Sequence, residues 1–540
     1  MLALARAGST GEAARRFAEY GLAGVDDEDV ASLEARIAKD EALTGGGDFA
    51  RAATLYERVF RHTAGYYPAV NAATLCVLAG ERERAHELAR EARGVLVRSG
   101  DDSYYGVATE AEIALVLGEL DVAAEALTRT AAAYGGDFSA LATTRRQLRV
   151  LIEATGADPV LLDALAGPGV VHFCGHRIGE RFPAHAEAEV AVRIAEELAA
   201  SQPGFAYGAL ANGADILCAE ALIALGAELH IVLPFAHEEF VQSSVADGGS
   251  GWVRRFERCM AAASSISYAT DDAFLGDDVL YRYGSELAMG MALQRAAWLD
   301  SEARQLAVWD GQPAGGEAGT AIDIATWSRT GNHVLVIDPE GAGRTDRGQS
   351  LVDATTPACQ DDRGARRVVR ALLFADVKGF SALTDEQLPR FAETVMGAFA
   401  AVLDRHAADV EYRNTWGDAL YVVLRDAGRA AACAYELSDA LTQIDLGAAG
   451  LPPHLGLRLG GHVGPVFPIR DPVIGNGAFM GSHVSRTARI EPVTPPGAVY
   501  VTDAFAAALA LAGSDYSCDY VGHMPAAKDY GRLRMFRLRR

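Results

Sequence analysis

The chain has 540 residues, of which 50% are hydrophobic and 22% are charged, and its formal net charge is −23 at pH 7. This balance is typical of a globular protein, and the length predicts about three domains. The strong negative charge disfavours nonspecific binding to nucleic acids or to anionic membranes. No apolar run approaches the ~20 residues of a membrane-spanning helix, and the first residues lack the apolar core of a signal peptide.

The seven cysteines are scattered along the chain and never form a CxxC pair. An odd number without such spacing disfavours both a disulfide framework and a zinc site, and it is typical of a reducing compartment. We therefore expect a cytoplasmic protein that binds neither nucleic acid nor membrane.

Residues 1–165 are rich in Ala, Leu, Glu and Arg, with apolar residues at helical spacing. A short signature recurs as GDFARA from Gly47, GERERA from Gly80 and GELDVA from Gly118, at intervals of roughly 35 residues, which predicts stacked helix-turn-helix repeats. These repeats resemble tetratricopeptide repeats. The resemblance implies a protein partner or autoregulation, and a plain helical spacer is the alternative.

Residues 168–340 have a different pattern, in which short apolar runs alternate with helical stretches. The runs are VVHFCG, FAYGAL, ELHIVLP, SISYAT, RQLAVWDG and HVLVIDP. This alternation predicts an α/β segment with a parallel sheet. Ligands of such sheets bind beyond the carboxyl ends of the strands, where glycine-rich turns meet helix N-termini.

Three glycine-containing turns of this segment fit such a site, and DGQPAGGEAGT is the best phosphate cradle because its glycines expose N–H groups before a helix. The stretches NGADILCAEALIALGAELHIVLP and GGEAGT resemble the SLOG family of Rossmann-like nucleotide-binding domains. This resemblance implies a nucleotide ligand, with a nucleotide or NAD hydrolase as an alternative. The candidate residues are Gly175, Gly213, Asp215, Gly315, Gly316, Gly319 and Thr320.

Residues 341–366 are polar, rich in Gly, Asp and Arg, and lack periodicity, which predicts a linker. The apolar run ALLFADVKGF then follows, and it ends on Asp376. A carboxylate at the end of a buried strand costs several kcal/mol to desolvate unless a metal ion or a cation compensates it. The sequence therefore predicts such a partner for Asp376.

The stretch VEYRNTWGDALYVVLRD predicts two strands joined by a tight turn at Trp416, Gly417 and Asp418. Asp418 can then share a site with Asp376. Two neighbouring carboxylates repel one another unless a cation lies between them, and Mg²⁺ commonly takes one or two carboxylates together with substrate phosphates and water.

Four motifs occur in the order FADVKGFSAL, NTWGDALYVV, RLGGHVGPVF and GSHVSRTARIEPVTPPGAVYVTDAF. Together they resemble the class III nucleotidyl cyclase catalytic domain over residues 367–540. The resemblance implies an α+β ferredoxin-like βαββαβ core and an active site between two copies in a homodimer. It also implies conversion of a nucleoside triphosphate to a 3′,5′-cyclic nucleotide and pyrophosphate, with two Mg²⁺ or Mn²⁺ ions per site.

The resemblance assigns the metal ligands to Asp376, Asp418 and the backbone of Val377. Arg489 takes the position of the transition-state arginine, whose planar guanidinium suits charge on the α-phosphate. It is expected on one helical face with Ser485, four residues earlier. Lys528 matches a contact for the terminal phosphates.

Three positions depart from the family pattern. Ser485 stands where the family usually has an asparagine that orients the ribose, and serine is shorter with one donor. Asn414 and Ala478 stand where adenine-specific members have a base-reading lysine and aspartate. The base is therefore open between ATP, favoured by the family, GTP and a pyrimidine. A domain that binds nucleotide without cyclising it, as a regulatory protein, is the alternative function.

Overall fold

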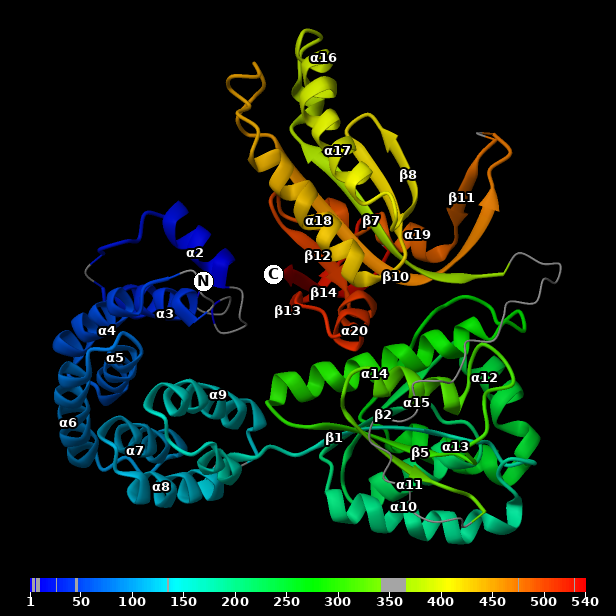
Figure 1. The fold of residues 1–540 in the computed structure, drawn as a ribbon, viewed down its shortest axis with the longest axis horizontal. Helices are drawn as coiled ribbons and strands as arrows, with labels where there is room; N and C mark the ends of the chain where they lie inside the picture. Colours follow the sequence, from blue (N-terminus) through cyan, green and yellow to red (C-terminus); the bar gives the residue numbers. More distant parts are fainter. Residues whose placement is uncertain are drawn as a thin grey trace. The chain divides into compact units, whose positions relative to one another are not determined.

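The computed structural model describes residues 1, 5, 10–25, 27–43, 47–133, 136–340, 366–473, 475–528 and 530–540. The predicted linker lies outside these residues except for residue 366. The chain forms two compact units (Figure 1), one made of residues 1–167 and 297–301 and the other of 168–296 and 302–540. A boundary between two domains inside the second unit stays a prediction. Among the described residues, no helix combines the length and apolarity that crossing a bilayer requires.

The first unit is helical, and each signature glycine lies just before a helix. Gly47, Gly80 and Gly118 precede helices that begin at residues 49, 82 and 120, and neighbouring helices pack in chain order. The predicted helical character of this region is thereby confirmed, whereas the stacked repeats and their assignment to tetratricopeptide repeats stay a prediction. The helices are α2 (Thr10–Glu19), α3 (Glu28–Leu43), α4 (Phe49–Thr63), α5 (Tyr66–Leu78), α6 (Arg82–Ser99), α7 (Tyr104–Leu117), α8 (Leu120–Ala133) and α9 (Phe138–Thr155).

The second unit begins with a parallel sheet whose six strands coincide with the six predicted apolar runs. The strands are β1 (Val170–Gly175), β2 (Phe205–Gly208), β3 (Glu228–Leu233), β4 (Ser265–Tyr268), β5 (Ala303–Val308) and β6 (His333–Ile337). Their order is β4-β3-β2-β1-β5-β6. The order reverses between β1 and β5, and ligands of parallel sheets bind at such a point.

Helices connect these strands and cover the sheet. Helices α10 (Glu187–Ser201), α11 (Ala214–Ala224) and α13 (Ser250–Ala262) pack together, and α12 (His237–Ser244) precedes α13. Helices α14 (Val279–Leu299) and α15 (Thr320–Ser328) lie on the opposite side of the sheet from α10 (Figure 1).

The second sheet of this unit is mixed. Its strands are β7 (Val368–Lys378), β8 (Val410–Trp416), β9 (Ala419–Leu424), β10 (Gly456–Arg470), β11 (Gly477–Met480), β12 (Val499–Thr502), β13 (Ser517–Pro525) and β14 (Arg532–Arg539). Its helices are α16 (Gln387–Phe391), α17 (Gly397–Arg405), α18 (Ala427–Thr442), α19 (Ser482–Thr487) and α20 (Asp503–Ala512). The path runs β13-β14-β12-β10-β7-β9-β8, with β11 paired to β10. The succession β7, α16–α17, β8, β9, α18, β10 is the expected βαββαβ order.

Alternation along β7 divides its side chains between two faces. Ala371, Leu373, Ala375 and Val377 are buried in the main core with residues of α17, α18 and α20. The intervening Leu372 belongs to a separate cluster on the other face, against which Val484 of α19 packs. Alternation places Asp376 on this second face.

Candidate active site

Asp376 lies within β7 rather than at its end, since the strand continues to Lys378. The prediction that the strand stops at Asp376 is therefore wrong. In the antiparallel pairing of β7 with β10, Asp376 lies directly opposite Arg458, and Arg458 Nη2 donates a hydrogen bond to Asp376 Oδ2. The chain itself therefore supplies the expected compensating cation for this carboxylate, which is the guanidinium of Arg458.

Asp418 reaches the same place from the turn between β8 and β9. Gly417 adopts a positive φ of 67°, which makes this tight turn possible without the strain of a side chain. The N–H of Val377 donates to Asp418 Oδ2 at 3.3 Å. Burial raises the pKa of Asp418 to about 6, and the neighbouring Asp376 carboxyl adds to the rise. The structure thus brings together the three residues proposed from the sequence as metal ligands.

Glu491 is a third acidic group here that the sequence analysis did not single out. Its Oε1 lies 2.9 Å from Arg458 Nε. Burial raises the pKa of Glu491 to about 7; Arg458 opposes this rise, and Asp376 and Asp418 add to it. An arginine within an otherwise apolar strand was the available signal for Arg458. No signal in the sequence marks Glu491, because an acidic residue shortly after an arginine is a common surface pattern.

These residues fit a divalent cation. Asp376 and Glu491 pair with the Arg458 guanidinium and Asp418 adjoins Asp376, so the cluster carries an excess of negative charge whenever its three acids are ionised. Oxygen ligands are those that Mg²⁺ and Mn²⁺ prefer, and a site with two aspartates leaves room for phosphate and water oxygens. Within the described part of the chain, no group of three or more His, Cys, Asp and Glu residues has metal-binding geometry. Substrate oxygens would therefore have to complete the coordination.

The arginine proposed for catalysis lies outside the helix expected to carry it. Helix α19 ends at Thr487, so Ser485 is helical and Arg489 lies in the following turn. The expectation that both share one helical face is therefore wrong. Among the described residues, no hydrogen bond or ion pair joins the Arg489 guanidinium to Asp376 or Asp418. Its carbonyl accepts the N–H of Ala527 at 3.1 Å, which places exposed Lys528 next along the chain.

The two base-reading positions lie on strands that are in contact but do not pair with each other. Asn414 is on β8 and Ala478 is on β11, and the rings of Tyr412 and Phe479, one from each strand, lie 6.4 Å apart. Asn414 Oδ1 accepts the N–H of Thr415 at 2.9 Å. That bond leaves the amide NH₂ of Asn414 as the group able to donate to a base.

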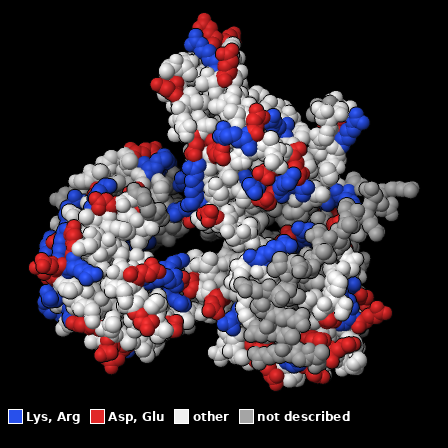
Figure 2. All heavy atoms as spheres, in the orientation of Figure 1, with Lys and Arg blue, Asp and Glu red and all other residues white. Residues whose placement is uncertain are grey.

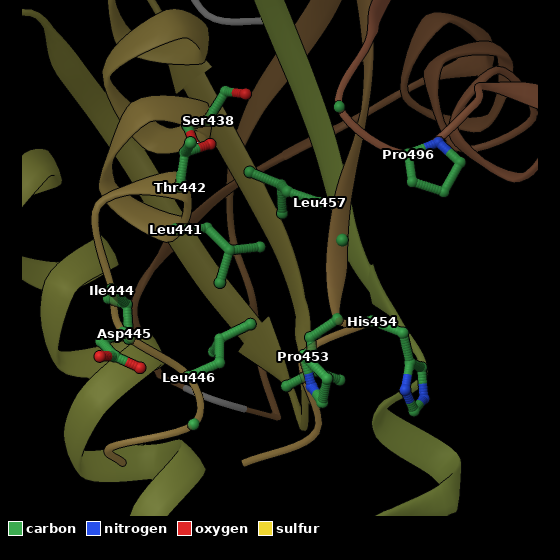
Figure 3. A pocket seen from close by; sticks show the side chains of 14 residues that line it. Ser438, Leu441, Thr442, Ile444, Asp445, Leu446, Pro453, His454, Leu457 and Pro496 are labelled. Atoms are coloured by element: carbon green, nitrogen blue, oxygen red, sulfur yellow. The ribbon is translucent and has the colours of Figure 1, made fainter. Parts of the chain in front are cut away.

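A hollow in this part of the unit lies away from these residues. It has a volume of about 570 Å³ and is lined by α18, the loop that follows it and the start of β10. Figure 3 shows Leu441 and Thr442 on the helix, with His454 and Pro496 across from them. Neither aspartate lines it. Alternation along β10 places its Leu457 on the face opposite Arg458.

The glycines of the first sheet have several roles. A Cβ on Gly175 would lie 2.4 Å from the Cβ of Ala214, so this glycine permits close packing of β1 against α11. Gly213 has φ +89° and would carry a Cβ 2.7 Å from the carbonyl oxygen of His176. Close packing explains both positions, and the positive φ of Gly213 is a second reason for glycine there.

The glycine-rich turn before α15 already has a carboxylate against it. Asp278 Oδ2 accepts the N–H of Glu317 at 3.2 Å, and a Cβ on Gly316 would lie 2.2 Å from that oxygen. Gly319 needs its positive φ of 127°, whereas Gly315 faces open space. The predicted cradle therefore exists as a turn in which an acidic side chain accepts one of the exposed N–H groups.

Polar residues missed in the sequence surround Thr320 at the point where the strand order reverses. Thr320 Oγ1 lies 3.4 Å from His176 Nδ1, and His176 Nε2 lies 3.0 Å from Asp310 Oδ1. Arg181 donates to both oxygens of Asp310, at 2.8 and 2.6 Å. Although burial opposes ionisation, these hydrogen bonds hold the pKa of Asp310 well below its usual range. His176 and Arg181 follow β1, and Asp310 follows β5. The sequence alone does not show that these two strands are adjacent.

Asp215 lies beneath this site as a buried carboxyl group. The N–H of Ala211 donates to its Oδ2 at 3.1 Å, and its Oδ1 has no hydrogen-bond partner in the described structure. Burial raises the pKa of Asp215 to about 7. Burial also raises the pKa of Asp323, in α15, to about 7, and Asp215 adds to that rise while Ser285 opposes it.

Surface charge is mixed in sign. On the face seen in Figure 2, acidic and basic side chains are interspersed over the described residues of both units. The net charge of −23 is thus spread rather than gathered there.

No protein-family model matches the sequence, and none of the curated proteins compared with it matches either. Solved structures are similar over part of the chain. The guanylyl cyclase Cya2 is 22% identical with a TM-score of 0.29, over 33% of this chain and 94% of that one. The adenylyl cyclase CyaB from P. aeruginosa is 15% identical (TM-score 0.29; 32% and 95%). The guanylate cyclase domain of RhGC from Catenaria anguillulae, in complex with GTP, is 17% identical (TM-score 0.28; 32% and 96%).

Proposed function

We propose that residues 367–540 form a nucleotidyl cyclase that converts a nucleoside triphosphate to a 3′,5′-cyclic nucleotide and pyrophosphate. One observation carries the proposal: Asp376 from β7 and Asp418 from the adjoining turn lie close together, since the N–H of Val377, next to Asp376, donates to Asp418 and the Asp376 carboxyl raises the pKa of Asp418. Proteins seldom keep two such groups together without a cationic ligand, because each disfavours ionisation of the other. The ordered motifs that contain both residues support the same reaction.

The residues of the chain would divide the work of this reaction. Asp376, Asp418 and the Val377 carbonyl would hold Mg²⁺ or Mn²⁺, which lowers the pKa of the attacking 3′-hydroxyl and offsets charge on the leaving pyrophosphate. Arg489 would donate to the α-phosphate oxygens as negative charge develops there. Ser485 would hydrogen-bond the ribose, and Lys528 would pair with the terminal phosphates as a point charge.

A homodimer would bring the two halves of this machinery together. Within one chain, no described hydrogen bond or ion pair links Arg489 to the aspartates, although phosphoryl transfer needs them around one phosphate chain. A second copy related by a two-fold axis would supply Arg489 and Ser485 to the first copy's Asp376 and Asp418, and receive the same in return. Each dimer would then have two equivalent sites.

The alternative is a domain that binds nucleotide without cyclising it. Arg458 already neutralises Asp376 without a metal ion, and Ser485, Asn414 and Ala478 lack the side chains that orient substrate in the family. Such a domain would report nucleotide binding to the rest of the chain. For such a domain we expect metal-dependent binding of nucleotide without formation of a cyclic product.

The test is product analysis with the full chain. The protein is incubated with Mn²⁺ or Mg²⁺ and separately with ATP, GTP, CTP and UTP, and mass spectrometry looks for a cyclic mononucleotide. Asp376→Ala should lower the rate by about a hundredfold or more. The matched control is Glu436→Ala, which removes a carboxylate from α18 that accepts hydrogen bonds from Arg405 and His406. Metal-dependent binding without product from any nucleotide would reject the cyclase and support the alternative.

A nucleotide is also the proposed ligand of the first sheet. Thr320, His176 and Asp310 line the point where the strand order reverses, beside the glycine-rich turn. Binding of ATP, ADP and NAD to the Asp376→Ala chain would be measured by calorimetry, with Thr320→Val as the variant expected to weaken it. Hydrolysis products of the same nucleotides would reveal a hydrolase instead.

A further inference from the structure

An acidic loop, residues 270–278, joins β4 to α14 and contacts α19. Its sequence is TDDAFLGDD, with four aspartates. Asp272 Oδ1 accepts the hydroxyl of Ser482 at 2.6 Å, and Asp271 Oδ2 pairs with Arg486 Nη2 at 2.9 Å. Ser482 and Arg486 are four residues apart and share one face of α19. Two adjacent loop carboxylates thus hold both ends of one helical turn.

A buried chain of side chains holds the same turn from inside. Thr270 Oγ1 lies 2.9 Å from His483 Nε2, His483 Nδ1 lies 2.6 Å from His462 Nε2, and His462 Nδ1 lies 2.7 Å from Thr502 Oγ1. Burial lowers the pKa of both histidines, so both rings are neutral and each contact contains one proton. Gly464 makes room for the second ring, since a Cβ there would lie 2.2 Å from His483 Nδ1.

The acidic loop is itself fixed to the start of β7. Arg367 is 6% exposed, and its Nη1 lies 3.0 Å from both carboxylate oxygens of Asp277. Its Nη2 donates to the carbonyl of Ala273 at 3.0 Å, and its guanidinium lies over the ring of Phe467. An ion pair with a buried guanidinium restricts movement of the loop relative to the sheet.

Helix α19 depends on such contacts for its position. It has six residues, and Gly481 before it provides no side-chain cap. A helix this short is unstable on its own, so tertiary contacts determine where it lies. Ser485 belongs to α19 and Arg489 follows it in the next turn, so a shift of the helix moves both.

We infer that the acidic loop is a positioning element for the cyclase reaction. Thr270, Asp271 and Asp272 act through His483, Arg486 and Ser482 to set the placement of Ser485 and Arg489. None of the three loop residues contacts the reacting atoms. The segment that follows β4 of the parallel sheet therefore controls the geometry of a site carried by the other sheet. The effect on turnover rests on the proposed function. The effect of the loop on the position of α19 can be measured without any assumption about that function.

The experiment compares the full chain with Asp272→Ala and Thr270→Val. Hydrogen–deuterium exchange reports the protection of the amides of residues 482–489, independently of any activity. Steady-state kinetics with the triphosphate that gives product separates kcat from KM. We expect faster exchange in that segment and a kcat lowered by about tenfold to a hundredfold, because misplacing a catalytic group by about 1 Å has such an effect. KM should change by less than about threefold, since Arg489 acts mainly in the transition state.

A conservative variant and a control complete the test. Asp272→Asn keeps an oxygen that accepts a hydrogen bond from the Ser482 hydroxyl. Its amide protection in residues 482–489 and its kcat should therefore both stay close to the wild-type values. Glu436→Ala should leave both unchanged. Unchanged exchange in Asp272→Ala and Thr270→Val would overturn the inference, and so would faster exchange with an unchanged kcat. A wild-type chain that forms no cyclic nucleotide would reject the proposed function, while its exchange pattern would still decide whether the loop holds α19.

Discussion

Arg458 and Asp376 are direct cross-strand partners in the pairing of β10 with β7, and the arginine donates to the carboxylate from Nη2. The same guanidinium lies 2.9 Å from Glu491 through Nε. A single cation therefore compensates a cluster in which a divalent ion is also proposed to bind. The guanidinium and the metal ion would offset the same negative charge, which makes their effects on stability interdependent.

The first prediction concerns Arg458→Met, which keeps the length of the side chain and removes its charge. Without divalent ions, the carboxylates lose their partner, and the melting temperature of the second unit should fall by about 2–4 °C. Added Mg²⁺ should raise the melting temperature of this variant more than that of the wild type. Thermal unfolding with and without Mg²⁺ measures both effects.

The control for this prediction is Arg405→Met, which breaks the 2.8 Å ion pair with Glu436 on the surface of the same sheet's helices. It should show the wild-type response to Mg²⁺. Equal Mg²⁺ shifts in all three proteins would mean that the cluster binds no divalent ion.

The second prediction concerns the choice of base. Asn414→Lys together with Ala478→Asp places a cation on β8 and an acceptor on β11, two strands that are in contact. The ratio of kcat/KM for ATP to that for the other triphosphates should rise by about tenfold or more, because a matched donor and acceptor reject bases that leave them unpaired. Competition assays with mixed nucleotides measure the ratio.

Single variants test whether the pair acts together. Ala478 is 8% exposed, so an aspartate alone would be desolvated without a partner and should reduce stability. Asn414→Lys alone should change the ratio less than the double variant. If the double variant leaves the ratio unchanged, these two positions do not read the base.

The sequence predicted the local structure well because hydrophobic patterns determine it. All six strands of the parallel sheet matched predicted apolar runs, since buried parallel strands read as short continuous apolar segments. Asp376 stands out in the sequence because a charge interrupts such a run. The tight turn at Gly417 followed from the residues on either side of it.

Pairings between distant strands could not be predicted. Arg458 opposes Asp376 only because β10 pairs with β7 in one register, and a shift of one residue would have turned it to the opposite face. The end of α19 at Thr487 was missed because short helices are limited by tertiary contacts rather than by propensity. Thr270 and His483 are 213 positions apart in the chain, and no local pattern connects them.

The third prediction concerns a buried polar cluster within the helices of the first unit. Lys39 Nζ donates to Asn71 at 2.6 Å and to Gln147 at 3.1 Å, while Glu112 accepts from Thr74 and Gln147, each at 2.6 Å. Burial lowers the pKa of Lys39 and raises that of Glu112, and each opposes the other's shift. Glu112→Ala would leave a buried ammonium group without its acid, a loss of about 3–5 kcal/mol.

Chemical denaturation followed by circular dichroism measures this loss. The double variant Lys39→Met with Glu112→Ala removes both charges and should recover most of the stability, because no uncompensated charge remains. A double variant as unstable as Glu112→Ala alone would show that lost packing, rather than charge, is responsible.

The fourth prediction concerns pH. An ordinary aspartate in the unfolded chain has a pKa of about 4, whereas burial raises the pKa of both Asp215 and Asp323 to about 7 in the folded chain. Between these values the unfolded state has released the proton that the folded state still holds. Stability contributed by these groups is therefore complete below about pH 4, falls as the pH rises, and is lost above about pH 7.

Asp323→Asn removes one of the two carboxyl groups whose pKa is raised in the folded chain. The melting temperature of the full chain should therefore fall less between about pH 5 and about pH 8 in this variant than in the wild type. Asp385→Asn, at an exposed position before α16, is the matched control and should reproduce the wild-type slope. An Asp323→Asn slope equal to that of the wild type would mean that the buried pair is already ionised at neutral pH, with a cation inside the site to compensate it.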